Sequence, residues 1–428
     1  MQNSTTRLTV LENGLRIVTE QVPDLESAAL GIWVGSGARD EMQTEHGIAH
    51  LLEHMAFKGT STRSAEMIAR EIEAVGGDLN AMTSHETTGY HARILGQDVP
   101  LGIDILSDIV VDSIFDSEEL GREQQVIVQE IGAAHDTPDD LVFDLFQEAA
   151  FGAQPLGRPI LGTPESVTGF SAGDLRKFLE RNYGPHEMVV TAAGAIDHDM
   201  VVELALSRLG GRTTNGHPQP EPAEFIGGDR RADRPLDQIH IVMGLPGPDR
   251  SAEDFHAARV AATALGGGMS SRLFQEVREK RGLCYSVYAF NASYRDSGLF
   301  AFSAATAPEL AGELIEVLTD EISHAALRLT EEDVDRARAQ LRASLLMSLE
   351  STSNRADRLA RQLLFFDRIV PLAETREKIE AVTLEDVRRV LNRALEGRLA
   401  FAAVGPVERL PSVDALAARI GCSAPMQG

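Results

Sequence analysis

The 428-residue chain is predicted to be an α+β protein of two homologous domains, each a mainly antiparallel sheet with helices packed on one face. Three observations lead to this prediction: a linker-like stretch near the middle, a pattern repeated in the two halves, and the order of strands and helices within each half. A chain of this length is expected to form two or three domains rather than one.

The stretch from Gly210 to Gly228, GGRTTNGHPQPEPAEFIGG, is rich in Gly, Pro and polar residues and has little to bury. Such a composition is typical of a linker. We therefore expect an N-terminal domain over residues 1–211, a linker over 212–233 and a C-terminal domain over 234–428. Each domain is then about 200 residues long, an ordinary size.

The two halves repeat one pattern about 212 residues apart. A helical segment around Asp174 leads into an apolar strand that ends at Gly194, and the same features run from Asp386 to Gly405. A second pair matches SEELGREQQVIVQEI with TEEDVDRARAQLRASL at nearly the same offset. One duplication explains both matches, and no short-period solenoid repeat is indicated.

Within each half the predicted strands come before most of the helices. The strands are LRIVTEQV and SAALGIWVG in the N-terminal half, and IHIVMG and LFAFSAAT in the C-terminal half. Long helical patterns lie between and after them, which favours a sheet with a layer of helices in each half.

The run EHGIAHLLEHMAFKGT predicts an amphipathic helix with histidines on its polar face. Thr44 is expected to cap this helix and Glu45 to lie in its first turn. The apolar stripe consists of Ile48, Leu51, Leu52, Met55 and Ala56. The opposite side carries His46, His50, Glu53, His54 and Phe57.

Two histidines one turn apart, His50 and His54, can bind one Zn²⁺, and Glu53 on the same face can reach a bound water. The pattern His-x-x-Glu-His is the inverted form of the zinc-protease motif. The alternative is a solvated polar helix face. His46 is a rival ligand, but it lies nearer the helix start, and we expect it to take no part.

A zinc site of this kind needs a third protein ligand. Glu123 and Glu130 lie two turns apart on the predicted helix EELGREQQVIVQEI, beside its apolar stripe. A carboxylate at the edge of a buried face usually has a partner, although a solvated acidic helix edge is the alternative. The repeat has Arg336 and Ala343 at the matching positions, so these acids belong to the half with the histidines.

Together these motifs resemble the pitrilysin/insulinase family of zinc peptidases, in particular its short-chain branch of mitochondrial processing peptidase and bacterial relatives. The resemblance covers essentially the whole chain and rests on GIAHLLEHMAFKGT, GGDLNAMTSHETTGYHARI, REQQVIVQEI and ALGGGMSSRLFQEVREKRGLCYSVYAF. It implies that His50, His54 and Glu130 bind one Zn²⁺ per chain. It also implies that Glu53 is the general base and that Glu123 supports the metal ligands.

The resemblance further implies the substrate contacts. Asn80 and Ala81 would lie on the sheet edge where the substrate adds as a strand. Arg278 and Tyr285, in REKRGLCY, would hold the substrate and its developing oxyanion.

The glycine triplet Gly266, Gly267 and Gly268 has two readings. A Gly-rich stretch before a helix is reminiscent of a phosphate-binding loop, but GGGMSSR lacks the Gly-Lys-Ser/Thr ending. From the residues alone we expect a flexible loop or a helix-entry turn, and the resemblance implies a loop that contacts the substrate.

The implied function is a zinc-dependent endopeptidase that cleaves unfolded peptides inside a clamshell chamber formed by two chains, with Glu53 activating a zinc-bound water. Because this chain has both the zinc motif and the Arg278/Tyr285 pair, we expect a homodimer in which that pair acts in trans. Two alternatives remain: the zinc subunit of an obligate heterodimeric peptidase, and a non-catalytic peptide-binding or assembly subunit.

The formal charge of -25 at pH 7 argues against nucleic acid or an anionic membrane as a partner. Cys284 and Cys422 have no metal-like spacing and fit a reducing compartment. We expect no signal peptide and no membrane-spanning segment. These features predict a cytoplasmic protein.

Overall fold

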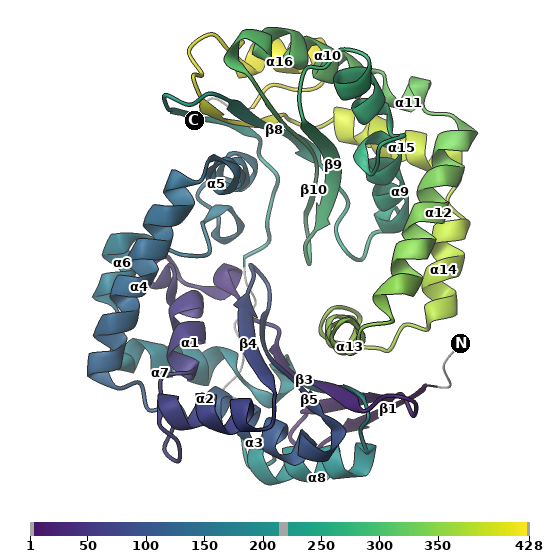
Figure 1. Cartoon of the computed structure of the whole chain (residues 1–428). Coiled ribbons are helices and arrows are strands. Elements are labelled where there is room, and N and C mark those ends of the chain that lie inside the picture. The colour runs from purple at the N-terminus through teal and green to yellow at the C-terminus, as the bar shows by residue number, and fades with distance from the viewer. Residues whose placement is uncertain (1–3, 214–220, 426–428) are drawn as a thin grey trace. The chain divides into compact units, whose positions relative to one another are not determined.

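The computed structural model describes residues 4–213 and 221–425 and divides into two compact units. Unit 1 comprises Met1–Ile131, Ile160–Glu221 and Leu346–Ile369. Unit 2 comprises Gly132–Pro159, Pro222–Leu345 and Val370–Gly428. Each unit contains one sheet and its own helices (Figure 1).

The sheet of unit 1 has six strands in the order β1-β2-β6-β3-β5-β4. The strands are β1 (Thr5–Val10), β2 (Arg16–Gln21), β3 (Ser27–Val34), β4 (Asp78–Thr83), β5 (Thr88–Leu95) and β6 (Met188–Gly194). All neighbours are antiparallel except β2 and β6. Among the described residues β4 therefore pairs with β5 alone and forms an open edge.

One face of this sheet packs against the main helical layer of unit 1. Alternate residues of β3, among them Leu30 and Ile32, point into that core because side chains in a strand alternate between faces. The helices are α1 (Ile48–Ala56), α2 (Ala65–Ala74), α3 (Val99–Val111), α4 (Ser117–Asp136), α6 (Pro164–Gly169), α7 (Ala172–Asn182) and α8 (His198–Leu209). The last turn of α4 belongs to unit 2.

The opposite face of the same sheet carries α13 (Thr352–Phe366), which comes from much later in the chain (Figure 1). Two apolar clusters hold it there, one of Val18, Val189, Leu359 and Leu363, the other of Ala29, Ala193 and Ala356. Beside them the buried Glu20 of β2 accepts hydrogen bonds from Arg355 and Arg358 of α13. This helix is therefore fixed to the sheet by both apolar and ionic contacts.

The sheet of unit 2 has five strands in the order β7-β11-β8-β10-β9. The strands are β7 (Gly228–Asp233), β8 (Ile239–Pro246), β9 (Ser286–Ser293), β10 (Gly298–Thr306) and β11 (Ala400–Gly405). Its helices are α5 (Pro138–Phe151), α9 (Phe255–Gly266), the π-helix η6 (Phe274–Glu279), α10 (Ala311–Ser323), α11 (Ala325–Arg328), α12 (Glu331–Ser348), α14 (Leu372–Glu380), α15 (Leu384–Leu395) and α16 (Val413–Ile420). Most of them pack on one face around a single core.

Each half of the sequence contributes one helix to the unit that is built mainly from the other half. Helix α5, from the N-terminal half, packs on the second face of the unit 2 sheet, against β11, β7 and β8 (Figure 1). Helix α13, from the C-terminal half, does the same in unit 1. The compact units therefore differ from the contiguous division at 212–233: residues 132–159 lie with unit 2 and residues 346–369 with unit 1.

The predicted α+β fold with two sheets is confirmed, and the four strands predicted from sequence are β2, β3, β8 and β10. Within the expected linker, residues 214–220 lie outside the described residues, and its end forms β7. Strands β6 and β11 end at Gly194 and Gly405 as the repeat predicts, and both glycines have positive φ.

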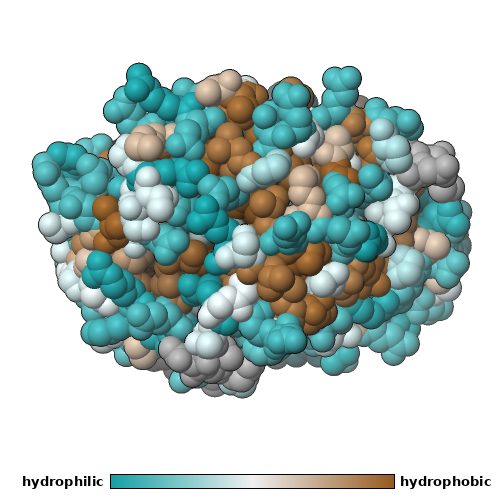
Figure 2. All heavy atoms as spheres, turned by 90° about the horizontal axis from the view of Figure 1, so that it is seen from below, coloured by the Kyte–Doolittle hydropathy of each residue, from teal (hydrophilic) through white to brown (hydrophobic). Residues whose placement is uncertain are grey.

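No helix among the described residues is both long and apolar enough to cross a lipid bilayer. On the face shown in Figure 2, apolar residues gather in several brown clusters that are separated by hydrophilic residues. Exposed apolar residues are normal on a protein surface.

Candidate active site

Helix α1 carries the predicted histidine motif, but it begins later than expected. Thr44 and Glu45 lie in a 3-10 turn, Gln43–Glu45, and α1 starts at Ile48 after Gly47. The prediction that Thr44 caps this helix is therefore wrong, and so is the placement of Glu45 in its first turn. Glu45 instead forms an ion pair with Arg181, with a shortest distance of 2.6 Å.

The N-terminus of α1 is capped from a distance by Glu41. Its buried carboxylate accepts hydrogen bonds from the backbone N–H groups of Gly47 (3.0 Å) and Ala49 (2.9 Å). These are two of the amides that a helix start leaves without an intrahelical partner. Gly47 has a φ of 91° and packs tightly against Gly162, where a Cβ atom would approach the Gly162 Cα to 2.8 Å. The first turn of α1 is therefore fixed both by charge and by packing.

The predicted division of α1 into two faces is confirmed within the helix, Ile48–Ala56, but Phe57, predicted on the polar face, follows the helix and packs against the apolar core instead. The residues of the apolar stripe are buried: Ile48, Leu51, Leu52, Met55 and Ala56. His50, Glu53 and His54 are only partly buried and lie away from that core. His46 precedes the helix, so the helical count that placed it on the same face as His50 does not apply.

Three of the predicted residues come together as a candidate metal site. One ligand atom each from His50, His54 and Glu130 lies within 4.8 Å of the others, and no other such group exists among the described residues. The Glu130 Oε2 atom is 3.5 Å from His54 Nε2 and 3.9 Å from His50 Nε2. The imidazole rings meet edge-on, with centroids 4.6 Å apart. The imidazole and carboxylate donors and their spacing fit a divalent metal such as zinc.

Glu123, two turns before Glu130 on α4, holds His54 from the other side. Its Oε2 atom lies 2.9 Å from His54 Nδ1, and its Oε1 atom accepts a hydrogen bond from Lys58 Nζ at 2.7 Å. Burial tends to raise the pKa of Glu123, but the bonds from Lys58 and His54 outweigh this and lower it below the ordinary value. A carboxylate on Nδ1 leaves Nε2 of His54 available as a ligand atom and fixes the ring orientation.

The protonation of His50 and Glu53 also suits a metal-assisted reaction. Burial, and then the charge of His54, lowers the pKa of His50 to about 4, so this imidazole is neutral and able to bind metal at pH 7. Burial raises the pKa of Glu53, with Thr83 and His54 acting in the opposite direction. A carboxylate whose pKa is raised is better matched to proton transfer near neutral pH.

Strand β4 offers an open edge in the same unit. Asn80 and Ala81 lie in the middle of β4, and the Asn80 side chain accepts a hydrogen bond from the backbone N–H of Ala81 at 2.8 Å. An open edge with accessible backbone groups is a template for a further strand. The expected sheet-edge position of Asn80 and Ala81 is therefore confirmed, whereas their contact with substrate stays a prediction.

Arg278 and Tyr285 lie together in unit 2. The Arg278 guanidinium donates to the backbone carbonyl of Tyr285 at 2.7 Å and lies 4.5 Å from the centre of its ring. Phe274 packs on the guanidinium as well, at 4.7 Å. Tyr285 is 79% exposed. The pair therefore presents a cation and a phenol hydroxyl on an exposed surface.

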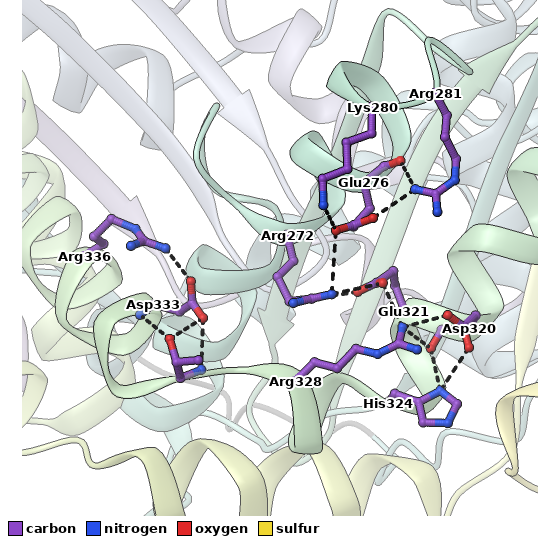
Figure 3. Close-up of polar contacts among 11 residues, drawn as sticks. Arg272, Glu276, Lys280, Arg281, Asp320, Glu321, His324, Arg328, Asp333 and Arg336 are labelled. Atoms are coloured by element: carbon purple, nitrogen blue, oxygen red, sulfur yellow. Dashed lines mark hydrogen bonds and ion pairs between the residues drawn. The ribbon is translucent and has the colours of Figure 1, made fainter.

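A network of ion pairs fixes the segment that carries Arg278 (Figure 3). Arg272, just before η6, binds the buried Glu321 of α10 at 2.7 Å, and Arg328 binds the same carboxylate at 2.7 Å. Within the segment, Glu276 accepts from Lys280 at 2.6 Å and from Arg281 at 2.9 Å. A π-helix with this support gives Arg278 a defined position, and such helices often occur at functional sites.

The glycine triplet spans the end of α9: Gly266 is its last residue, and Gly267 and Gly268 begin the short loop before the next helical segment. Gly266 is buried against β9, where a Cβ atom would lie 2.1 Å from the Ala289 nitrogen. Gly267 follows the last turn, and Gly268 faces Gln340. Close packing explains why Gly266 is a glycine, and a substrate contact by the three residues stays a prediction.

Two residues that support this site were missed from the sequence. Lys58 lies two residues past the end of α1, so the helical count does not place it beside Glu123. Glu41 gave no local signal, because its carboxylate folds back onto amides that follow a separate turn.

Comparison with known proteins is consistent with these features. The sequence profile described as Insulinase (Peptidase family M16) matches residues 16–164, and the profile described as Peptidase M16 inactive domain matches residues 169–341. An uncharacterized zinc protease of Mycobacterium bovis is 41% identical over 407 residues, covering 94% of this chain and 93% of its own. An uncharacterized zinc protease of Bacillus subtilis is 36% identical over 405 residues, covering 94% and 98%.

Two solved structures share the fold. A protease from Helicobacter pylori superposes with a TM-score of 0.85 at 20% identity, covering 94% of this chain and all of its own. A peptidase M16 inactive domain from Pseudomonas fluorescens gives a TM-score of 0.87 at 19% identity, covering 94% and 98%. With both profiles matched and relatives this similar over most of their length, the chain belongs to the insulinase family, peptidase family M16.

Proposed function

We propose that this protein is a zinc-dependent endopeptidase that cleaves unfolded peptides. The observation that carries the proposal is the convergence of His50, His54 and Glu130 beside Glu53, a partly buried carboxylate on the same helix. The relatives carry the name zinc protease, which supports zinc as the metal. The second unit offers no such cluster within the described residues, so one metal per chain is expected.

In the proposed reaction His50, His54 and Glu130 hold the metal. When bound there, Zn²⁺ would supply Lewis-acid chemistry by acidifying a water and polarising the peptide carbonyl. Glu53 removes a proton from the attacking water and delivers it to the leaving amine. Arg278 and Tyr285 hold the substrate, and a donor such as the Tyr285 hydroxyl would stabilise the developing oxyanion by about 2.7–4 kcal/mol.

The substrate is proposed to bind as an additional strand on β4, at Asn80 and Ala81. Strand addition uses main-chain hydrogen bonds and therefore requires an extended, unfolded segment. The open edge of β4 supports this mode of binding.

Removal of the metal tests the proposed function directly. A chelator is expected to abolish cleavage of an unfolded peptide, and one equivalent of Zn²⁺ per chain is expected to restore it. Mass spectrometry of the products and metal analysis of the protein measure both. Cleavage that continues in a metal-free protein would contradict the proposal, and binding of peptide without cleavage by the zinc-loaded protein would favour the assembly or peptide-binding alternative.

Glu123→Gln is expected to weaken zinc binding by about 10–100-fold, because partners that orient a ligand typically contribute this much. Gln keeps the size of the side chain but removes the charge that His54 and Lys58 contact. Competition with a fluorescent zinc chelator measures the affinity. Glu118→Gln, on an exposed part of the same helix, is the matched control and should bind zinc normally.

We further propose that the protein acts as a homodimer in which Arg278 and Tyr285 complete the metal site of the other subunit. Support comes from the presence of both residue sets in one chain. Glu53→Gln protein mixed with Arg278→Ala protein by subunit exchange should recover cleavage, which each variant alone lacks. Verified mixed dimers without activity would exclude sharing in trans, and a protein that is monomeric alone and active only with a second polypeptide would indicate a heterodimer.

A cytoplasmic location stays a prediction. Both Cys284 and Cys422 are free thiols in the structure, as is usual in a reducing compartment. Cell fractionation followed by immunoblotting tests it, and recovery with secreted or envelope proteins would contradict it.

A further inference from the structure

Helix α13 does not cover its face of the unit 1 sheet completely. A cleft of about 240 Å³ remains between α13 and strands β3, β5 and β4. Its lining consists of Ala29, Leu30, Trp33, Met82, His91, Ala92, Ser353, Asn354, Ala356, Asp357 and Arg361. All of these residues belong to unit 1, and Met82 brings the cleft to the open edge strand.

In the duplicated interface of unit 2, aromatic side chains occupy the corresponding place. Aligning the buried positions of α5 and α13 makes Phe143 the counterpart of Asp357. The strand register makes Phe290 the counterpart of Met82. Phe290 pairs with Ala301, which pairs with Gly244 of β8. In the same way Met82 pairs with Gly89, which pairs with Trp33 of β3. Phe143 and Phe290 pack together with ring centroids 5.8 Å apart. Unit 2 therefore fills with two aromatic rings the space that unit 1 leaves between Asp357 and Met82.

Elsewhere in this interface the two units fill the space equally well with different residues. In unit 2, Phe146 lies on Gly244, where a Cβ atom would be 2.4 Å from the Phe146 Cζ. In unit 1 the corresponding residues are Ala360 and Trp33, both buried, so that the large side chain comes from the strand instead of the helix. At this point each unit has one large side chain, Phe146 in unit 2 and Trp33 in unit 1. At the position of the Phe143/Phe290 pair, by contrast, unit 1 has smaller side chains and a cleft remains.

The cleft lies on the side of β4 toward which a bound strand would direct every second side chain. Leu79 and Ala81 pack toward the helical core, whereas Met82 lines the cleft on the opposite face. Side chains of a strand added to β4 would alternate in the same way. Resting on the proposed function, we infer that this cleft is a specificity pocket that receives one large apolar side chain of a peptide bound along β4.

The chemistry of the lining defines the class of side chain. The walls are mostly apolar, formed by Trp33, Met82 and several alanines. The Asp357 carboxylate is already paired with Arg361 at 2.7 Å, and the His91 ring stacks on Trp33. A pocket with apolar walls and internally paired charges favours an aromatic or long aliphatic residue over a charged one.

The experiment uses a set of unfolded, tryptophan-free peptides of one alanine- and serine-rich sequence, in which a single Phe is moved position by position. The reference peptide, called the all-Ala peptide, has Ala in place of the Phe. At one position relative to the cleaved bond, Phe is expected to raise kcat/KM at least about tenfold over Ala, the range typical of apolar pockets. Asp357→Phe, which copies Phe143, should abolish this preference while the all-Ala peptide is still cleaved. Asp357→Asn, which removes the charge but not the space, should keep it, and Glu180→Phe on the exposed side of α7 is the unchanged control.

A second readout does not depend on cleavage. Trp33 is the single tryptophan of the chain, so its fluorescence reports directly on the cleft. In zinc-loaded Glu53→Gln protein, the Phe peptide should shift the Trp33 emission and the all-Ala peptide should not. If Asp357→Phe does not fold, Met82→Phe, which copies the partly buried Phe290, fills the cleft from the strand side.

The outcomes separate the pocket from the proposed function. Peptide cleavage with an unaltered Phe preference in both filled variants overturns the pocket but leaves the peptidase intact. A Trp33 response without cleavage by the wild-type protein keeps the pocket and overturns the peptidase. A preference for Lys over Phe that Asp357→Asn removes overturns the apolar class.

Discussion

Replacing Glu53 by Gln is expected to lower the rate of peptide cleavage by a factor of about 10²–10⁴, the usual contribution of a positioned acid or base. Gln has the same shape as Glu but cannot accept the proton of the attacking water. Glu53 does not belong to the cluster of His50, His54 and Glu130, so the variant should still bind one Zn²⁺. Cleavage assays and metal analysis on the same preparation measure both properties.

The separation of activity from metal content is what makes this variant informative. His50→Gln should lose the metal and the activity together, whereas His46→Gln, outside the cluster, should keep both. Glu53→Gln protein that cleaves peptides as fast as the wild type would exclude Glu53 as the base. Loss of zinc from that variant would mean that Glu53 has a structural role in the site.

Glu20→Ala is expected to destabilise unit 1 by about 3–5 kcal/mol, the usual consequence of removing one partner from a buried ion pair. Glu20 is 3% exposed and Arg355 is 8% exposed, so the arginine would be left buried without its carboxylate. Arg358, bound to the other Glu20 oxygen at 3.1 Å, would lose its partner as well. Chemical unfolding followed by Trp33 fluorescence measures the change, since Trp33 lies on the same face of the sheet.

Asp24→Ala is the matched control for this prediction, because Asp24 is exposed between β2 and β3. Surface changes of this kind usually alter stability by less than about 0.5 kcal/mol. An unfolding midpoint for Glu20→Ala equal to that of the control would show that the contacts of Glu20 with α13 contribute little net stability. The apolar clusters under α13 would then be its main attachment.

Features set by local periodicity could be predicted from the sequence. The apolar stripe of α1 and the shared face of Glu123 and Glu130 follow from helical spacing, and the structure has both. The strands β3 and β8 were evident from short apolar runs with β-branched and aromatic residues. Duplication was evident as well, because it repeats these local patterns at one offset.

Features set by contacts between distant segments could not be predicted in the same way. The start of α1 is fixed by Glu41 and Gly162, which lie outside its own sequence pattern. The exchange of α5 and α13 depends on which sheet each helix packs against, and an amphipathic pattern does not name its partner. The cleft beside Asp357 is lined by side chains of α13 and of three strands that lie far from it in the sequence, so no local pattern predicts it.

The exchange of helices also has a consequence for synthesis on the ribosome. The last strand of the unit 1 sheet, β6, ends at Gly194, whereas α13 ends at Phe366, about 170 residues later. At roughly 5–20 residues per second, the apolar patch around Val18 and Val189 waits on the order of 10 to 30 seconds for its covering helix. The nascent N-terminal half therefore carries an uncovered apolar surface, which is prone to aggregation, for most of the synthesis of the C-terminal half.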